Sequence, residues 1–199
     1  MKKITISIIL LLFIISLTGC NKKEVNITAE DITSNTILVK SNGELQVAFV
    51  EDFDKSYYNL SELDEFVKKE ISLYNQQAGS EEIEIKDLLL RDGKAIMLLT
   101  FSGMAHYSAF NDVSAAYFNA DMDNVALSLP EQFISAKDGS LVDRDSAMNN
   151  GKYKVVVLYE PFDIIVEGSV KYYSENVTLA ANNKVQSNSE DMTVVIYKP

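Results

Sequence analysis

The stretch Thr36-Ile-Leu-Val-Lys-Ser-Asn-Gly-Glu-Leu-Gln-Val-Ala-Phe-Val50 decides the fold, because it holds two strand-like runs joined by a short polar turn. Asn42-Gly43 readily adopts the positive φ angles that a tight turn between antiparallel strands requires. In the second run Leu45, Val47 and Phe49 alternate with smaller or more polar residues. Since neighbouring side chains of a strand point to opposite faces, the sequence predicts a β-hairpin with one buried face.

The hydrophobic period changes after this hairpin. Apolar side chains recur at the spacing of one helix face: Leu60, Leu63, Phe66, Val67, Ile71 and Tyr74. Asn59 and Glu62 form a reciprocal capping pattern at the start of this segment, and Gly79 follows its end. The sequence therefore predicts one principal amphipathic helix over about residues 60–77.

A second hairpin is predicted on the C-terminal side of this helix. Residues 82–86 alternate cleanly, but Leu88 and Leu90 lie on the opposite parity from the earlier apolar residues. A bulge near Lys86-Asp87 would bring both sets onto one face. Asp92-Gly93 then predicts a tight turn into another strand.

The remainder of the chain is rich in strand patterns. Strands are expected at residues 94–101, 132–136, 140–142, 152–160, 162–166, 170–178 and 192–197. Residues 103–124 leave two alternatives open: a short helix near Met104 is followed by either a strand or a second helical turn. Together these patterns predict an α+β fold with antiparallel sheets and a second half that is mostly β. The globular domain is expected over residues 36–199, as one unit or as two that divide near 121–130.

The first twenty residues have the order of a secretory signal: basic residues, an apolar run and small residues. Lys2 and Lys3 precede an uncharged stretch over residues 4–17, which is shorter than the roughly 20 residues of a transmembrane helix. Leu17-Thr18-Gly19-Cys20 resembles the lipobox of bacterial lipoproteins. The alternative is a plain secretory signal in which the cysteine stands by chance.

The lipobox resemblance implies a type II signal peptide over residues 1–19 that is removed, and lipid attachment at Cys20. It implies a protein held on the extracytoplasmic face of the cell membrane, since two acyl chains anchor firmly. Without residues 1–19 the chain has 16 basic against 29 acidic side chains, a net charge of −13. This charge is repelled by anionic head groups and argues against a nucleic-acid partner. Residues 20–35 are expected to form the lipidated cysteine and a flexible tether, with a first strand at 25–28 as the alternative.

Few residues of the chain suit nucleophilic catalysis. His106 is the one histidine, and Cys20, the one cysteine, is the expected lipid site, so a cysteine–histidine pair is not expected. His106 stands among apolar neighbours, where a structural or surface imidazole is more common than a catalytic one. The sequence therefore predicts neither a catalytic residue nor a cofactor.

Two Asp-x-Asp pairs are the remaining candidates for chemistry: Asp121 with Asp123, and Asp143 with Asp145. Paired carboxylates can act as acid and base on a glycosidic bond, or can contribute to a calcium site. With 29 acidic residues in the chain, however, such pairs arise by chance. The glycine and closing glutamate of an EF-hand loop are also missing, so solvated acidic loops without a metal are expected.

Two tyrosine pairs are candidates for recognition. Tyr57-Tyr58 precedes the predicted helix, and Tyr172-Tyr173 lies in a predicted strand. Exposed tyrosines are good anchors for a protein partner or a sugar ring. The structural alternative is cross-strand packing within the sheets.

The mature body resembles uncharacterised small lipoproteins of Gram-positive bacteria in two runs, Asp52-Phe-Asp-Lys-Ser-Tyr-Tyr58 and Tyr172-Tyr-Ser-Glu-Asn-Val-Thr178. That resemblance implies no activity. We therefore expect a non-enzymatic envelope lipoprotein that binds a protein or ligand partner. The alternatives are a carboxylate-based hydrolase that acts on envelope glycan and an assembly factor for exported proteins.

Overall fold

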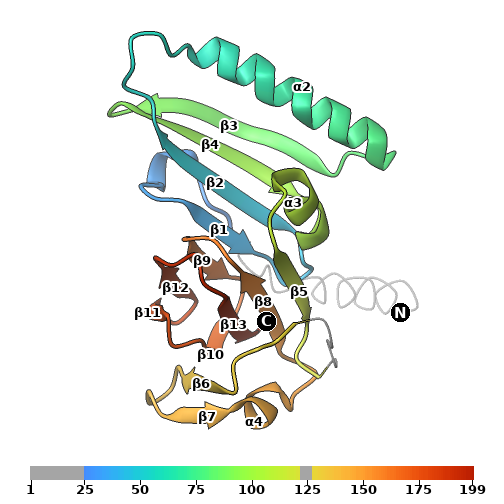
Figure 1. Cartoon of the computed structure of the whole chain (residues 1–199), viewed down its shortest axis with the longest axis vertical. Helices are drawn as coiled ribbons and strands as arrows, with labels where there is room; N and C mark the ends of the chain where they lie inside the picture. The colour runs from blue at the N-terminus through green and yellow to red at the C-terminus, as the bar shows by residue number, and fades with distance from the viewer. Residues whose placement is uncertain (1–24, 122–126) are drawn as a thin grey trace, which may run out of the picture.

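Two β-sheets and three α-helices make up the part of the chain that the computed structural model describes, residues 25–121 and 127–199 (Figure 1). The strands are β1 (Thr36–Val39), β2 (Leu45–Asp52), β3 (Ile83–Arg91), β4 (Lys94–Phe101), β5 (Ala115–Asn119), β6 (Gln132–Ser135), β7 (Leu141–Asp143), β8 (Lys154–Leu158), β9 (Asp163–Val166), β10 (Ser169–Tyr173), β11 (Val177–Ala181), β12 (Lys184–Ser187) and β13 (Thr193–Lys198). The helices are the 3-10 helix η2 (Ala29–Asp31) and the α-helices α2 (Leu60–Ala78), α3 (Met104–Asn111) and α4 (Arg144–Met148). The predicted α+β class, with a second half that is mostly strand, is confirmed.

The larger sheet combines strands from both halves of the chain, whereas the smaller sheet is formed by residues 115–198. The larger sheet has the order β11-β12-β9-β1-β2-β4-β3, and the smaller has the order β5-β8-β13-β10-β6-β7. In the larger sheet β1 and β9 run parallel, with Ile37 opposite Ile164, whereas the sequence led us to expect antiparallel sheets. A parallel pair needs a long crossover, and here the chain between β1 and β9 supplies it, passing through other strands of both sheets.

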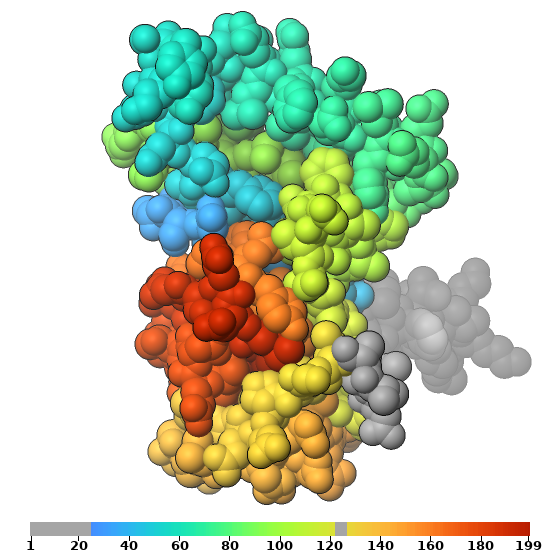
Figure 2. All heavy atoms as spheres, viewed as in Figure 1, coloured from blue at the N-terminus to red at the C-terminus, as the bar shows by residue number. Residues whose placement is uncertain are grey.

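The main core joins one face of the larger sheet to the smaller sheet, α2 and α3. Its buried residues include Val47 and Leu99 of the larger sheet, Val156 of the smaller sheet, and Ile71 of α2. A second cluster lies around Phe133 on the other face of the smaller sheet. In the space-filling view α2 forms one end of the elongated molecule, and the β6–β7 region with α4 forms the other (Figure 2).

Helix α2 confirms the predicted segment to within a residue at its end. The Asn59 side-chain oxygen accepts hydrogen bonds from the backbone N–H groups of Ser61 (2.9 Å) and Glu62 (3.4 Å), and Gly79 ends the helix at φ +78°. Val67 is buried, but Phe66, which was predicted to face the core, is 61% exposed. One residue turns a helix by about 100°, so two adjacent residues cannot both face the core centrally. The prediction for Phe66 was therefore wrong.

The predicted hairpins are confirmed, including the bulge. The register of β3 on β4 shifts between Ile85 and Asp87, so Lys86 is the extra residue. Asp92 and Gly93 take φ angles of 52° and 75° in the second turn, whereas Gly43 alone has positive φ in the first.

The structure decides between the two alternatives for residues 103–124 and contradicts one predicted strand. Residues 104–111 form α3, and residues 115–119 form strand β5, which pairs with β8. The single strand expected over 170–178 is wrong, because residues 174–176 separate β10 and β11, which belong to different sheets.

The predicted tether is largely part of the fold. Ile32 is buried with Ala29 against the outer face of the larger sheet, in the cluster Ala29, Ile32, Ala48, Ile96 and Leu98. The Arg91 guanidinium donates hydrogen bonds to the backbone carbonyl oxygens of Ala29, Glu30 and Ile32. The flexible tether is therefore wrong for residues 26–35, and so is the alternative strand at 25–28. Packing of this segment on a sheet formed by later residues overrode its polar composition.

Candidate functional site

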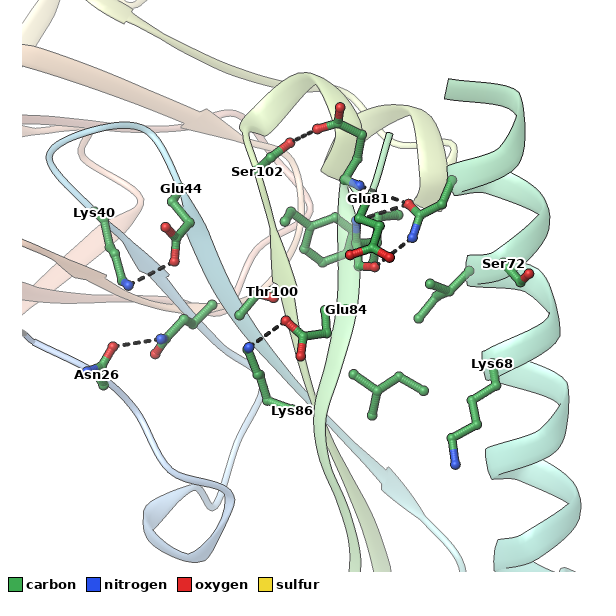
Figure 3. Close-up of a pocket in the computed structure, with 17 residues that line it drawn as sticks. Asn26, Lys40, Glu44, Lys68, Ser72, Glu81, Glu84, Lys86, Thr100 and Ser102 are labelled. Atoms are coloured by element: carbon green, nitrogen blue, oxygen red, sulfur yellow. Dashed lines mark hydrogen bonds and ion pairs between the residues drawn. The ribbon is translucent and has the colours of Figure 1, made fainter. Parts of the chain in front are cut away.

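A wide polar groove passes around the start of the edge strand β3, with α2 on one side of that strand and the outer face of the larger sheet on the other (Figure 3). Its volume is about 1020 Å³, and it is open to solvent. The residues that line it come from the N-terminal segment, the β1–β2 turn, β2, α2, the α2–β3 loop, β3, and β4 with the residue that follows it. The groove thus gathers segments that are distant in the sequence.

Charged side chains of this groove are engaged with one another. Lys40 Nζ lies 2.8 Å from Glu44 Oε1, and Lys86 Nζ lies 2.5 Å from Glu84 Oε2 (Figure 3). The Gln46 amide donates a hydrogen bond to Asn26 Oδ1 at 2.7 Å. Because positive and negative groups are paired side by side, the groove presents little net charge of either sign to a small ligand.

A cluster centred on Glu82, which we call the Glu82 cluster, lies at one end of the groove: Tyr74, Ser80, Glu82, Ser102 and His106. The hydroxyl groups of Ser80 and Ser102 both donate hydrogen bonds to the Glu82 carboxylate. His106 Nε2 lies 3.2 Å from Glu82 Oε2, and His106 Nδ1 lies 3.1 Å from the Tyr74 hydroxyl. A neutral imidazole can therefore donate to Glu82 and accept from Tyr74 at the same time.

The electrostatics of the Glu82 cluster stabilise a carboxylate. Hydrogen bonds from Ser102 and then Ser80 hold the pKa of Glu82 below its ordinary value, and the nearby His106 acts in the same direction. Next to the cluster, the Asn75 side chain accepts from the backbone N–H of Glu82 and Ile83 and donates to the Ile83 carbonyl at 2.9 Å. The Asn75 bonds connect the end of α2 to the start of β3. The contacts of Glu82 with Ser102 and His106 connect the start of β3 to the end of β4 and to α3.

The order of contacts in the Glu82 cluster differs from that of a nucleophile activated by a base. In such a unit the nucleophilic hydroxyl donates to the base, which a third group orients. Here the Ser102 hydroxyl donates to Glu82, and the carboxylate stands between the serine and His106. The sequence favoured a structural or surface imidazole over a catalytic one, and in the structure His106 contacts both Glu82 and Tyr74.

The Asp-x-Asp pairs have separate roles in the structure. Asp143 caps α4 by accepting hydrogen bonds from the backbone N–H and hydroxyl of Ser146, both at 2.9 Å, and these hold its pKa below the ordinary value. The Asp145 side chain is 94% exposed and lies 3.8 Å from Arg144. Asp121 is exposed, and its partner Asp123 lies outside the described residues. In residues 25–121 and 127–199, no three histidine, cysteine or acidic side chains are grouped closely enough to hold a metal ion.

The two tyrosine pairs differ in exposure. Tyr172 and Tyr173 are both partly buried, one against the core of the smaller sheet and the other against the main core, so packing explains this pair. Tyr57, in contrast, is 75% exposed, and Tyr58 is 43% exposed. Tyr58 stacks on Phe53 with ring centroids 4.9 Å apart, which holds the pair in place beside the β3–β4 turn.

Exposed apolar side chains gather on one unit of the fold. Five of the six large apolar side chains that are exposed in the described part of the chain lie on the β2–α2 loop, α2 and β3, and we call them the apolar ridge: Tyr57, Tyr58, Phe66, Leu73 and Leu90. The sixth, Leu141, lies on β7 at the far end of the molecule. The spacing of seven residues between Phe66 and Leu73 was the sequence signal for a second apolar face, but it lay beside the stronger core-facing stripe.

Comparison with protein families, curated proteins and solved structures finds no match. Cys20 lies outside the described residues. Within those residues, every helix is too short or too polar to cross a membrane.

Proposed function

We propose that this protein is a lipoprotein anchored through Cys20 on the extracytoplasmic face of the cell membrane, and that its folded body binds an envelope partner without catalysing a reaction. The apolar ridge is the observation that carries the binding role. Contiguous or concentrated exposed apolar groups on a soluble domain mark interaction sites, because leaving them in water costs free energy. Tyrosine and phenylalanine are also among the residues that contribute most at interfaces.

The chemistry of the polar side chains supports binding over hydrolysis. A glycosidase keeps one carboxyl group protonated through burial and the other ionised. Asp143 instead has its pKa lowered by helix capping, and the adjacent Asp145 is open to solvent. Glu82 likewise accepts hydrogen bonds that favour its ionised form.

Anchoring is tested at the N-terminus of the native protein. Mass spectrometry of the N-terminal peptide from membranes should find Cys20 as the first residue, with diacylglycerol on its sulfur. Cys20→Ala should move the protein from the membrane fraction to the soluble fraction. An uncut chain with a free Cys20 thiol would overturn the anchoring proposal.

Binding is tested by crosslinking on intact membranes, since this needs no prior choice of ligand. We expect a discrete crosslinked species that is lost with Phe66→Ser/Leu73→Ser and retained with Leu141→Ser. Leu141 is the matched control because its side chain is similarly exposed, at 57%, on a different part of the fold. Absence of any crosslinked species from correctly anchored protein would contradict the binding role.

A further inference from the structure

The apolar ridge stands in the most acidic part of the chain. Residues 51–92 contain twelve acidic and five basic side chains, a formal net charge of −7, while the whole chain carries −11. This segment is the last two residues of β2, the β2–α2 loop, α2, the α2–β3 loop, β3 and the first residue of the turn that follows, and it bears the ridge. Charge and exposed apolar surface are therefore concentrated on the same unit.

Helix α2 places acidic groups beside its exposed apolar side chains. Phe66 and Leu73 are seven residues apart, which is two turns and about 10 Å along one face of a helix. Glu62 and Glu70 stand four residues before and after Phe66, on the same face, and Lys69 is the one cation at the neighbouring positions. Glu62 is exposed and Glu70 is half-buried, so both border the apolar side chains.

The negative charge decides which occupants suit this face. A second copy of the chain would bring two segments of net charge −7 close together, and like charges across an interface oppose association. Anionic lipid head groups and other polyanions are repelled in the same way. A partner with positive side chains is favoured for two reasons: its binding buries the apolar groups, and its cations neutralise the acidic side chains around them.

We propose that the apolar ridge docks a basic protein segment in which lysine or arginine side chains surround a few large apolar ones. This inference rests on the proposed binding function and adds the chemistry of the partner. The apolar side chains of the segment contact Phe66, Leu73 and the tyrosines, and its cations lie against Glu62 and Glu70. Since charge pairs at the rim of an interface act mainly on association, the complex forms faster at low ionic strength.

The first test uses a defined probe with the full lipidated chain in detergent micelles. The probe is an 18-residue amphipathic helical peptide of leucine and lysine, and its counterpart has glutamate at each lysine position. We expect the lysine peptide to bind, and Phe66→Ser/Leu73→Ser to weaken that binding about tenfold or more. Leu141→Ser should change it less than about twofold, since Leu141 lies outside the acidic unit.

Charge is tested by Glu62→Gln/Glu70→Gln, which preserves shape and removes two negative charges. We expect weaker binding of the lysine peptide and a smaller dependence on salt. Asp145→Asn is the matched control, because that side chain is exposed and lies far along the chain from the ridge. Urea unfolding midpoints equal to that of the unsubstituted chain would show that the two ridge variants, the Glu62→Gln/Glu70→Gln variant among them, and the two control variants all fold. Equal binding of both peptides, or equal losses in ridge and control variants, would overturn the inference.

The second test asks what the protein contacts on intact membranes. A photo-crosslinking phenylalanine derivative replaces Phe66 in one variant and Leu141 in another, and mass spectrometry identifies the partner segment that is captured. Capture of a segment with net positive charge from position 66 supports the inference. Capture from position 141 alone, or of an acidic segment from position 66, overturns it while leaving the binding role intact. No capture from either position overturns both.

Discussion

Replacing Ile32 by alanine tests the finding that residues 26–35, which follow the proposed anchor, belong to the fold. Ile32 is 7% exposed and packs with Ala48, Ile96 and Leu98 on the outer face of the larger sheet. Ile32→Ala removes three buried carbon atoms, and at roughly 0.8 kcal/mol for each this amounts to about 2.4 kcal/mol. A residual cavity adds to that cost. If this segment were a flexible tether, the same substitution would lower the free energy of unfolding by less than about 0.5 kcal/mol.

The assay is urea unfolding of a chain that begins at residue 21. The free energy of unfolding falls by about 2 kcal/mol for each molar of urea, so the expected loss of stability lowers the unfolding midpoint by about 1 M. Leu141→Ala is the control, since its side chain is 57% exposed and should cost little. Hydrogen exchange at the Ile27 amide, which donates to Gln46 Oε1 at 2.9 Å, reports local detachment of the segment.

The reasoning is refuted if Ile32→Ala and Leu141→Ala have the same midpoint as the unsubstituted chain while the Ile27 amide exchanges at the rate of an unstructured peptide. In that case residues 26–35 would behave as a tether in solution, as the sequence alone suggested. An intermediate result is also informative. Rapid exchange at Ile27 in Ile32→Ala only, with an unchanged global midpoint, would mean that the segment docks and detaches as a separate unit.

Four further predictions concern the polar sites and a turn. Because hydrogen bonds lower the Glu82 pKa, its stabilisation is present above the ordinary value of 4.5 and is lost as the pH falls through the lowered value; Glu82→Gln should therefore destabilise at pH 7 and flatten the fall of the urea midpoint in acid. Asp143→Ala should cost about 1 kcal/mol through loss of the α4 cap, and calcium in place of chelator should give no saturable rise in melting temperature. Gly43→Ala should cost about 1–2 kcal/mol in urea unfolding, because φ is +92° and the new Cβ would lie 3.0 Å from Tyr117.

Local sequence signals predicted the elements whose causes are local. Asn59 and Gly79 mark the ends of α2 because a cap and a left-handed residue act within one turn of the helix. The parity change before Leu88 located the bulge at Lys86, since a strand must keep its apolar residues on the buried face. Neither inference needed knowledge of distant residues.

Long-range pairing was outside the reach of the same signals. Nothing in the spacing of Ile37 and Ile164 indicates that β1 and β9 lie side by side and parallel, because 126 residues separate them. The docking of Ile32 depends in the same way on Ile96 and Leu98, which reach the outer face only once β4 is paired. A single isoleucine in a polar segment carries too little information to predict that contact.

The candidate site shows the same division. His106 could be singled out because it is the one histidine of the chain. Its partners could not, because Glu82 lies just before β3 and Tyr74 lies in α2, at no fixed spacing from His106 in the sequence. The apolar ridge was visible in part, since Tyr57-Tyr58 precedes the helix. Phe66 was assigned to the core because helical periodicity does not distinguish which of two adjacent apolar residues, here Phe66 and Val67, faces inward.

The corrected start of the fold changes how far the proposed anchor lets the protein reach. Cys20 and Asn26 are six residues apart, so a fully extended chain spans at most about 22 Å between them, against about 55 Å for the sixteen-residue tether first expected. Asn26 lies beside Gln46 at the start of β2, whereas Tyr57 and Tyr58 follow the other end of that strand. The eight residues of β2 are about 25 Å long. Under the proposed anchoring, a lipid on Cys20 would hold one end of β2 within about 22 Å of the membrane and leave the tyrosines free to lie about a strand's length farther out. The length of the folded body, more than the tether, would then set where the proposed partner meets the apolar ridge.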